Sequence, residues 1–454
     1  MPTKPFKKNL TNVASDVLNA IRNSASVDYR NYVPKATPDA DSVRAIGAVI
    51  MDHVAFQNEF INALINRIGR VVLSSKMYEN PWSMFKAGML EYGESIEDIF
   101  VNLAKPYEYD INESVTRQYQ LESADVRSAF YMLNYRKFYK VTITEPMLRQ
   151  AFLSYDGVAN LIAKIVDQLY SSANYDEFLT MKYMLARWIL DGHMKPVDID
   201  AVTTDNMKSI IGTVKGVSND LTFLSPNYNI AGVHNYTDKD DQFIIVNSKF
   251  DAKMDVEVLA AAFNMDKAEF FGHRVLVDSF GSLDTARLGE LFKGDTNYVE
   301  ISQAELTALD AIPAILVSRD FFQIYDNLFQ FTEKYNGEGL YWNYFNHVWK
   351  IFACSPFANA AVFVPDGSTV TSVTVTPSAL TIAAGGTGQL NASVEGTGFP
   401  EKSVTWSSNN DAITVDGTGL VTVASGTAKA TSAEITATST FDTTKTGTAT
   451  ITVA

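Results

Sequence analysis

Residues 339–364 read GLYWNYFNHVWKIFACSPFANAAVFV and directly precede an abrupt change in composition. The aromatic side chains of this run are Tyr341, Trp342, Tyr344, Phe345, Trp349, Phe352, Phe357 and Phe363. Aromatic residues at this density either fill a core or form a subunit contact, because each buries a large apolar area. A pair of core strands is the simpler interpretation, since phenylalanine-rich runs are usually buried. A contact between subunits is the alternative.

The order of residues in this run and in several other sequence blocks points to a protein family. These blocks are AIRNS at residues 20–24, YVP at 32–34 and further phrases at 60–69, 258–265 and 325–328. Together with GLYWNY, HVW, FANA and the closing AVFV, they resemble the major capsid proteins of phi-twenty-nine-like short-tailed bacteriophages. The specificity comes from the number and order of the blocks, because none of them alone is distinctive. The resemblance covers most of residues 1–365.

The resemblance implies an α+β capsid fold of the Hong Kong 97 type. Its parts would be an N-arm at residues 1–40, an extended E-loop hairpin at about 75–140, the spine helices of the P-domain at about 141–196, an A-domain at about 197–345 and a closing P-domain strand at about 346–365. It also implies self-assembly into pentamers and hexamers of an icosahedral or prolate shell. The implied partners are a scaffolding protein, a portal protein and packaged double-stranded DNA bound without sequence specificity. The protein would be made in the host cytoplasm and reside in the virion.

Length and charge limit the alternatives. At 454 residues the chain exceeds the size over which one core usually grows, so two or more domains are expected. The net charge of −15 argues against a nucleic-acid reader, because an acidic surface repels phosphate. No window approaches the run of about 18 apolar residues that a bilayer span requires, and the start MPTKPFKKNL lacks a secretory signal. We therefore expect no membrane partner.

Catalytic signatures are missing from the sequence. The histidines, His53, His193, His234, His273 and His347, are scattered without ligand spacing, so no metal site is expected. Cys354 is the single cysteine and stands among apolar residues, which favours inert packing over a nucleophile. We expect no catalytic residue, no cofactor and no metal, and hence not an enzyme.

Helical periodicity appears in three places. A long amphipathic helix is expected from Asp41 or Ser42 to Ile68. A second helix begins at Asp156 and carries Leu161 and Ile165 on its apolar face, and a third begins at Asp176, carries Trp188 and ends at Gly192. Two local signals add to these: residues 138–143 read as a strand, and Ser302 with Glu305 forms a capping box.

The composition changes at residue 366. Residues 366–454 are rich in Thr, Ser, Gly, Val and Ala and break into short alternating strands, which predicts an all-β sandwich with Trp406 as core anchor. The phrases PSALTI, QLNA and VTWSSNN resemble the bacterial Ig-like type 2 module. Such a domain, repeated on every subunit, could bind weakly to cell surfaces through multivalency. Decoration of the shell without a ligand is the equally open alternative.

We expect a structural protein that works by self-association. The candidate assembly or core positions are Leu161, Ile165, Trp188, Tyr341, Trp342, Tyr344, Trp349 and Phe357, with Trp406 in the Ig-like core, and the hairpin at 75–140 would reach across a neighbour. The alternative is a bacterial surface adhesin or enzyme that carries an Ig-like module. A phage tail or fibre protein is a third option, which should show repeats that this chain lacks.

Overall fold

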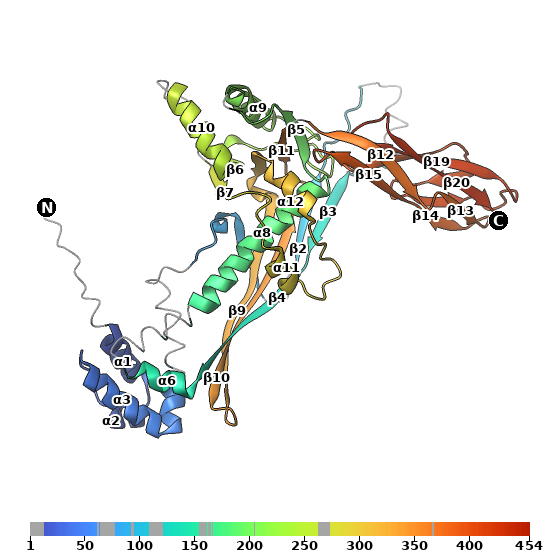
Figure 1. Ribbon diagram of the computed structural model, residues 1–454. Helices are drawn as coiled ribbons and strands as arrows, with labels where there is room; N and C mark the ends of the chain where they lie inside the picture. The colour runs from blue at the N-terminus through green and yellow to red at the C-terminus, as the bar shows by residue number, and fades with distance from the viewer. Residues whose placement is uncertain are drawn as a thin grey trace. The chain divides into compact units, whose positions relative to one another are not determined.

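The computed structural model, whose helices and strands are labelled in Figure 1, divides into two compact units. Unit 1 comprises Met1–Glu94, Met132–Phe178 and Ile324–Ile351, and unit 2 comprises Ser95–Tyr131, Leu179–Gln323 and Phe352–Ala454. The structure describes residues 13–60, 63, 78–91, 95–108, 121–153, 161, 165, 167–203, 205–261, 273–365 and 367–454.

Unit 1 begins with three helices, α1 (Val13–Ser24), α2 (Val27–Tyr32) and α3 (Ala40–Asp52). The carboxylate of Asp39 caps α3 by accepting a hydrogen bond from the Ser42 amide at 2.6 Å. The prediction of one helix reaching Ile68 is wrong, because α3 ends at Asp52 and His53 is extended, with φ −131° and ψ 116°. After this break Phe60 packs on Phe152, with ring centroids 5.3 Å apart. Residues 54–60 and 63 of that prediction are again helical, whereas residues 61–62 and 64–68 lie outside the described residues.

A four-stranded sheet forms the centre of unit 1, in the order β1 (Lys86–Met89), β9 (Phe322–Asn336), β10 (Tyr341–Cys354) and β4 (Tyr135–Thr144). Strands β10 and β4 are antiparallel, and their register runs from Tyr341 opposite Thr144 to Lys350 opposite Tyr135. The strand predicted at residues 138–143 is confirmed within β4. The expected A-domain boundary at 345 falls inside β10, because the pairing with β4 continues across it.

Alternation along β10 separates two environments. Trp342, Tyr344 and Val348 are buried, whereas Phe345 and Trp349 on the opposite face are only partly covered. Trp342 and Tyr344 join one hydrophobic cluster with residues of α1, α2 and α3 and with the positions at 161, 165 and 169. One strand of the aromatic run therefore contributes to the core with one face and leaves the other face accessible.

Helix α8 (Ser172–Leu190) follows directly on a π-helical turn, η3 (Asp167–Ser171). The predicted helix start at Asp176 is therefore wrong: Asp176 is fully buried within α8 and accepts a hydrogen bond from the Tyr139 hydroxyl at 2.9 Å. The predicted end at Gly192 is confirmed. Gly192 has φ +72°, its amide donates to the Ile189 carbonyl at 2.9 Å, and the His193 amide donates to Trp188 at 3.0 Å.

Unit 2 contains a five-stranded sheet in the order β5 (Lys195–Ile199), β11 (Ala360–Pro365), β8 (Ala314–Ser318), β6 (Gln242–Asn247) and β7 (Arg274–Val277). Its helices are α9 (Met207–Asp220), α10 (Ser248–Ala261), α11 (Thr285–Leu291) and α12 (Gln303–Asp310). Residues of α9, α10 and the sheet share one core, which includes Ile210, Phe250 and Phe363. The predicted capping box is confirmed, because Ser302 and Glu305 bond reciprocally at the start of α12.

The rest of unit 2 is all β, as the composition predicts. Its strands are β12 (Thr369–Thr376), β13 (Ala379–Ile382), β14 (Thr387–Gln389), β15 (Asn391–Thr397), β16 (Val404–Ser408), β17 (Ile413–Val415), β18 (Leu420–Val423), β19 (Ser432–Ser439) and β20 (Thr446–Val453). Alternate residues of these strands form a separate core around Leu390, Val421 and Ile451. Trp406 packs against that core from its margin and is only partly buried.

Candidate assembly surfaces

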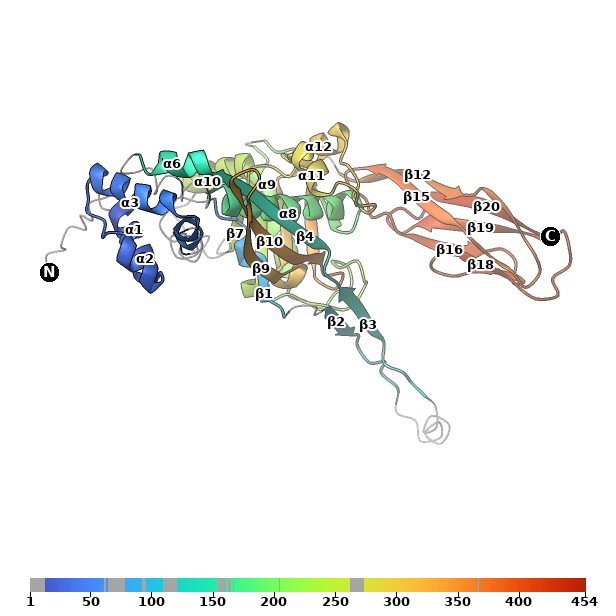
Figure 2. The same ribbon diagram turned by 90° about the horizontal axis from the view of Figure 1, so that it is seen from below.

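A two-stranded hairpin in unit 2 has one face fixed and one face accessible. Strand β2 (Ile96–Val101) pairs antiparallel with β3 (Val126–Tyr131), as Figure 2 shows. On the fixed face, the Asp98 carboxylate accepts hydrogen bonds from the Ser355 hydroxyl at 2.7 Å and the Tyr131 hydroxyl at 3.1 Å. Phe100 stacks on Phe357 with ring centroids 5.8 Å apart. Burial raises the pKa of Tyr131, so its hydroxyl stays protonated and continues to donate.

The accessible side of this hairpin, which we call the hairpin face, is apolar. Its exposed apolar side chains are Ile99, Val101, Val126 and Phe130, of which Phe130 is 64% exposed. The register places Val101 opposite Val126 and Phe130 opposite Glu97, so all of these side chains project from one side of the ribbon. Since contiguous exposed apolar surface on a folded protein usually marks an interaction site, this face is a candidate for one.

The accessible side of β4 and β10, which we call the basic aromatic face, combines cations with rings. The Arg136 guanidinium lies 5.4 Å from the ring centre of Trp349, and the Lys140 ammonium lies 5.9 Å from that of Phe345. Phe138, which is 59% exposed, meets the Phe345 ring edge-on at 5.9 Å. Arg and aromatic residues of this kind are enriched at the centres of protein interfaces.

The charge of this face contrasts with the charge of the chain. Strand β9 adds Thr332, which contacts His347 at 3.3 Å, and Lys334 two residues further on. Among the described residues, Arg136 and Lys140 form no ion pair with a carboxylate. A cationic surface in a chain of net charge −15 is suited to an acidic partner.

Charged side chains also gather in the interior of unit 1. Glu177 of α8 and Asp326 of β9 alternate with Lys350 of β10 and Lys86 of β1. Lys350 bonds both carboxylates, with 2.7 Å to Asp326, and the Asn80 amide donates to Glu177 at 2.6 Å. The side chains of Glu177 and Lys350 are 3% and 9% exposed. Two cations and two anions therefore balance, and they tie one helix to three strands.

The structure distributes the residues singled out by sequence over several environments. It brings Leu161, Ile165, Trp342 and Tyr344 together in the core cluster of unit 1, whereas Trp349 lies on the basic aromatic face. The Tyr341 hydroxyl accepts a hydrogen bond from Asn336 at 2.8 Å. Trp188 packs edge-on against His193 and Phe321, and Phe357 is buried beneath the hairpin. Sequence reasoning missed Arg136, Phe138 and Lys140, although their alternation in RKFYKVTIT was the available signal.

Features that would indicate other chemistry are weak in the described part of the chain. No cluster of histidine, cysteine and carboxylate side chains there is arranged to hold a metal ion. No helix among the described residues is long and apolar enough to cross a membrane. Cys354 is buried, and burial raises the pKa of its thiol, which disfavours the reactive thiolate.

Two protein-family models match this chain. The family model for the Phi29-like phage major capsid protein matches residues 18–364, and that for the bacterial Ig-like domain (group 2) matches residues 369–453. The major capsid protein of Bacillus phage B103 is 32% identical over 90% of this chain and 86% of its own length. That of Bacillus phage PZA is 33% identical over 88% and 85%.

A solved structure agrees at the level of the fold. A chain from the structure of head fiber and inner core protein gp22 of native bacteriophage P68 aligns with a TM-score of 0.51. It is 14% identical and the match covers 64% of this chain and 86% of that chain, so it speaks for a shared mixed α/β architecture only. The resemblance drawn from the sequence is confirmed by the family model and by both Bacillus phage relatives. The chain belongs to the Phi29-like phage major capsid protein family.

Proposed function

We propose that copies of this chain join into a shell when the hairpin face of one copy covers the basic aromatic face of another. As a phage major capsid protein, the chain is a structural component of the virion and is not an enzyme. Its family implies assembly into an oligomeric shell. The observation that supports the proposed pairing is the presence of two complementary accessible faces on one chain.

The two faces match in polarity. Phe130, Ile99 and their neighbours present an apolar strip that aromatic rings such as Phe138 and Phe345 can cover. Burying four half-exposed apolar side chains yields roughly 4 kcal/mol before the entropy cost of association is subtracted. Such a contact is weak alone, but a closed symmetric shell repeats it on every subunit.

The two faces also match in charge. The hairpin segment, residues 95–131, carries more acidic than basic residues: Glu97, Asp98, Glu108, Asp110, Glu113, Glu122 and Asp125 stand against Lys105, Arg117 and Arg127. The basic aromatic face supplies Arg136, Lys140 and Lys334. Two chains of charge −15 repel each other, so a contact that opposes these groups offsets part of the repulsion and selects the register.

Assembly of charge-swapped variants tests the pairing. Glu97→Lys and Lys140→Glu should each reduce the yield of shells, because each places like charges opposite one another. The double variant should recover shells if the two positions face each other across copies. Phe130→Ser should also lose assembly, whereas the matched control Phe223→Ser, at a position 69% exposed, should not. Shells would be counted by sedimentation and electron microscopy, and wild-type assembly of Phe130→Ser would refute the proposal.

We further propose that residues 1–365 adopt the Hong Kong 97-type arrangement. Support comes from the order of the elements: terminal helices, the β2/β3 hairpin, the long helix α8, and then a mixed sheet with flanking helices. Pentamers and hexamers, a scaffolding protein, a portal protein and double-stranded DNA as cargo belong to the same proposal. Cryo-electron microscopy of assembled particles with and without packaged DNA would test each of these partners.

For the Ig-like domain we propose either decoration of the shell or weak attachment to cell surfaces. Many copies on one particle raise the effective concentration, so a weak contact would suffice for attachment. Comparing host adsorption of particles with and without residues 366–454 distinguishes the two, since unchanged adsorption excludes attachment. Family membership supports the structural role over the alternative of a surface adhesin or enzyme.

A further inference from the structure

We infer that the Ig-like domain is docked in one fixed orientation on the C-terminal end of α8, through a joint made by residues 190–198 and 398–402 and the linker at 367–368. All of these residues belong to unit 2. The inference is independent of the pairing proposed above, because it concerns contacts within one chain. Such contacts would hold the domain in one orientation, whereas a flexible linker would let it rotate.

The first contact of the joint is electrostatic. The ammonium of Lys402 donates a hydrogen bond to the carbonyl of Leu190, the last residue of α8, at 2.6 Å. Carbonyls at the end of a helix lack partners within the helix, and the helix dipole makes this end negative. Lys402 therefore satisfies an acceptor of α8 with a charge-assisted bond donated from the Ig-like domain.

The second contact is a close approach of two backbones. A Cβ atom on Gly192 would lie 2.5 Å from the Pro400 carbonyl oxygen and 3.0 Å from the Lys402 amide nitrogen. Gly192 also has φ +72°, which the helix end requires and which other residues adopt only with strain. One glycine thus both terminates α8 and admits the loop of the Ig-like domain against the helix end.

The third contact fixes the linker. Pro365 at the end of β11 is still paired with Ile199 of β5. The Ser368 amide then donates to the Asp198 carboxylate at 3.0 Å, and the Ser368 hydroxyl donates to the Gly398 carbonyl. The chain is therefore held immediately before β12 begins, and the loop that carries Lys402 is bonded to the same point. Contacts on both sides of the domain base resist rotation about the linker.

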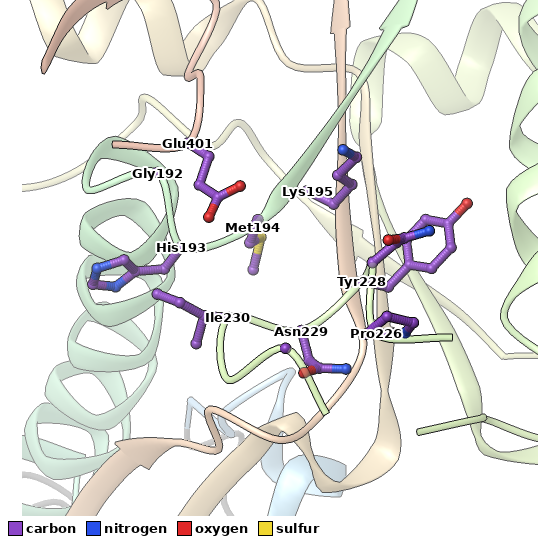
Figure 3. A pocket seen from close by; sticks show the side chains of 11 residues that line it. Gly192, His193, Met194, Lys195, Pro226, Tyr228, Asn229, Ile230 and Glu401 are labelled. Atoms are coloured by element: carbon purple, nitrogen blue, oxygen red, sulfur yellow. The ribbon is translucent and has the colours of Figure 1, made fainter. Parts of the chain in front are cut away.

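The joint depends on these polar and backbone contacts, because the space beside it is not filled. A pocket of about 180 Å³ opens there, lined by Gly192, Met194, Asn229 and Glu401 among others. Figure 3 shows the Glu401 carboxylate extending into this space from the Ig-like domain. A continuous apolar interface would tolerate loss of one lysine, whereas a joint with a gap should not. Lys402 and Asp198 are accordingly the residues to change.

Distance measurements in the full chain test the inference. Spin labels would be placed at Ser209→Cys on α9 and Thr448→Cys on β20, both exposed, and diluted with unlabelled chain to suppress distances between copies. Cys354 is 6% exposed and should remain unlabelled. We expect one narrow distance distribution for the otherwise unchanged chain. The variant Lys402→Met/Asp198→Ala should broaden it, and the control Lys429→Met, at an exposed lysine of the same domain, should not.

Hydrogen exchange in the single variant Lys402→Met provides a second readout. Loss of the charge-assisted bond in Lys402→Met should speed exchange of the amides that close the end of α8, those of Asp191, Gly192 and His193, by roughly tenfold. Protection of β20 should stay unchanged, which shows that the Ig-like domain remains folded. A broad distribution in the unchanged chain, or a narrow one in Lys402→Met/Asp198→Ala, would overturn the inference.

Discussion

Replacing Lys350 with methionine should strongly destabilise unit 1, although the side-chain length is nearly preserved. Lys350 is 9% exposed and bonds the carboxylates of both Glu177 and Asp326. The change removes one cation from a set in which charges balance, and Lys86 alone then faces two carboxylates. A buried charge without a partner is costly, because the interior cannot replace the hydration that it has lost.

The free-energy cost of Lys350→Met depends on how deeply the charges are buried and on the ion pairs that Lys86 still forms. Removing one partner of a buried pair typically costs about 3–5 kcal/mol, and the surviving contacts of Lys86 place Lys350→Met at the lower end, about 3 kcal/mol. Glu177→Gln removes the opposing charge, so Lys350→Met/Glu177→Gln leaves Lys86 and Asp326 as a matched pair. The double variant should therefore cost about 1–3 kcal/mol less than the sum of the two single changes.

Hydrogen exchange of β10 amides in the unassembled chain measures the free energy of opening for this unit alone. This choice matters because a chain with two compact units need not unfold in one step. Lys334→Met, at an exposed lysine of β9, is the matched control and should shift the opening free energy by no more than about 0.5 kcal/mol. A cost below about 1 kcal/mol for Lys350→Met, or strict additivity in the double variant, would refute the reasoning.

Three other predictions concern single contacts. Burial alone would raise the pKa of Asp326, but Lys350 and Lys86 hold that pKa below its ordinary value. Unit 1 should therefore lose stability as the pH falls below about 4 and the Asp326 carboxylate becomes protonated. Hydrogen exchange of β10 amides at several pH values measures this loss, and an opening free energy that does not change with pH would contradict it. Ser302→Ala should destabilise the start of α12 by about 1 kcal/mol, seen as faster exchange there, while Ser302→Thr should restore most of the cap. Gly47→Ala should lower the melting temperature of unit 1, because the new methyl would stand 2.4 Å from Cβ of Phe152 and overpacking costs about 1–3 kcal/mol; an unaltered melting temperature would show that α3 shifts freely.

Local signals were sufficient for several elements of the fold. The capping box at Ser302, the helix end at Gly192 and the strand at 138–143 each depend on side chains and backbone within a few residues, so one sequence reveals them. The prediction that a helix begins at Asp176 was wrong because it considered only the neighbouring residues in the sequence. An acidic residue after a polar stretch is typical of a cap, yet here tertiary burial and a bond from Tyr139 decide its role.

The accessible faces could not be read from local pattern alone. Phe138 and Phe345 are far apart in the chain and become neighbours only through the pairing of β4 with β10. The four charges around Lys350 likewise come from one helix and three strands that are distant in sequence. Such groupings depend on sheet order and register, which a single sequence does not specify. The aromatic run suggested core or contact as alternatives, and its alternation allows Trp342 and Trp349 to occupy different faces.

From Tyr341 to Trp349, strand β10 buries its even-numbered residues and presents its odd-numbered residues to the accessible face. Mutations in neighbouring codons should therefore give different defects in a phage. Substitutions at Trp342 or Tyr344 should yield insoluble or heat-sensitive protein, so that little folded subunit is available for assembly. Substitutions at Phe345 or Trp349 should yield soluble subunits that accumulate without forming heads, and such subunits could be mixed with wild type to interfere with its particles.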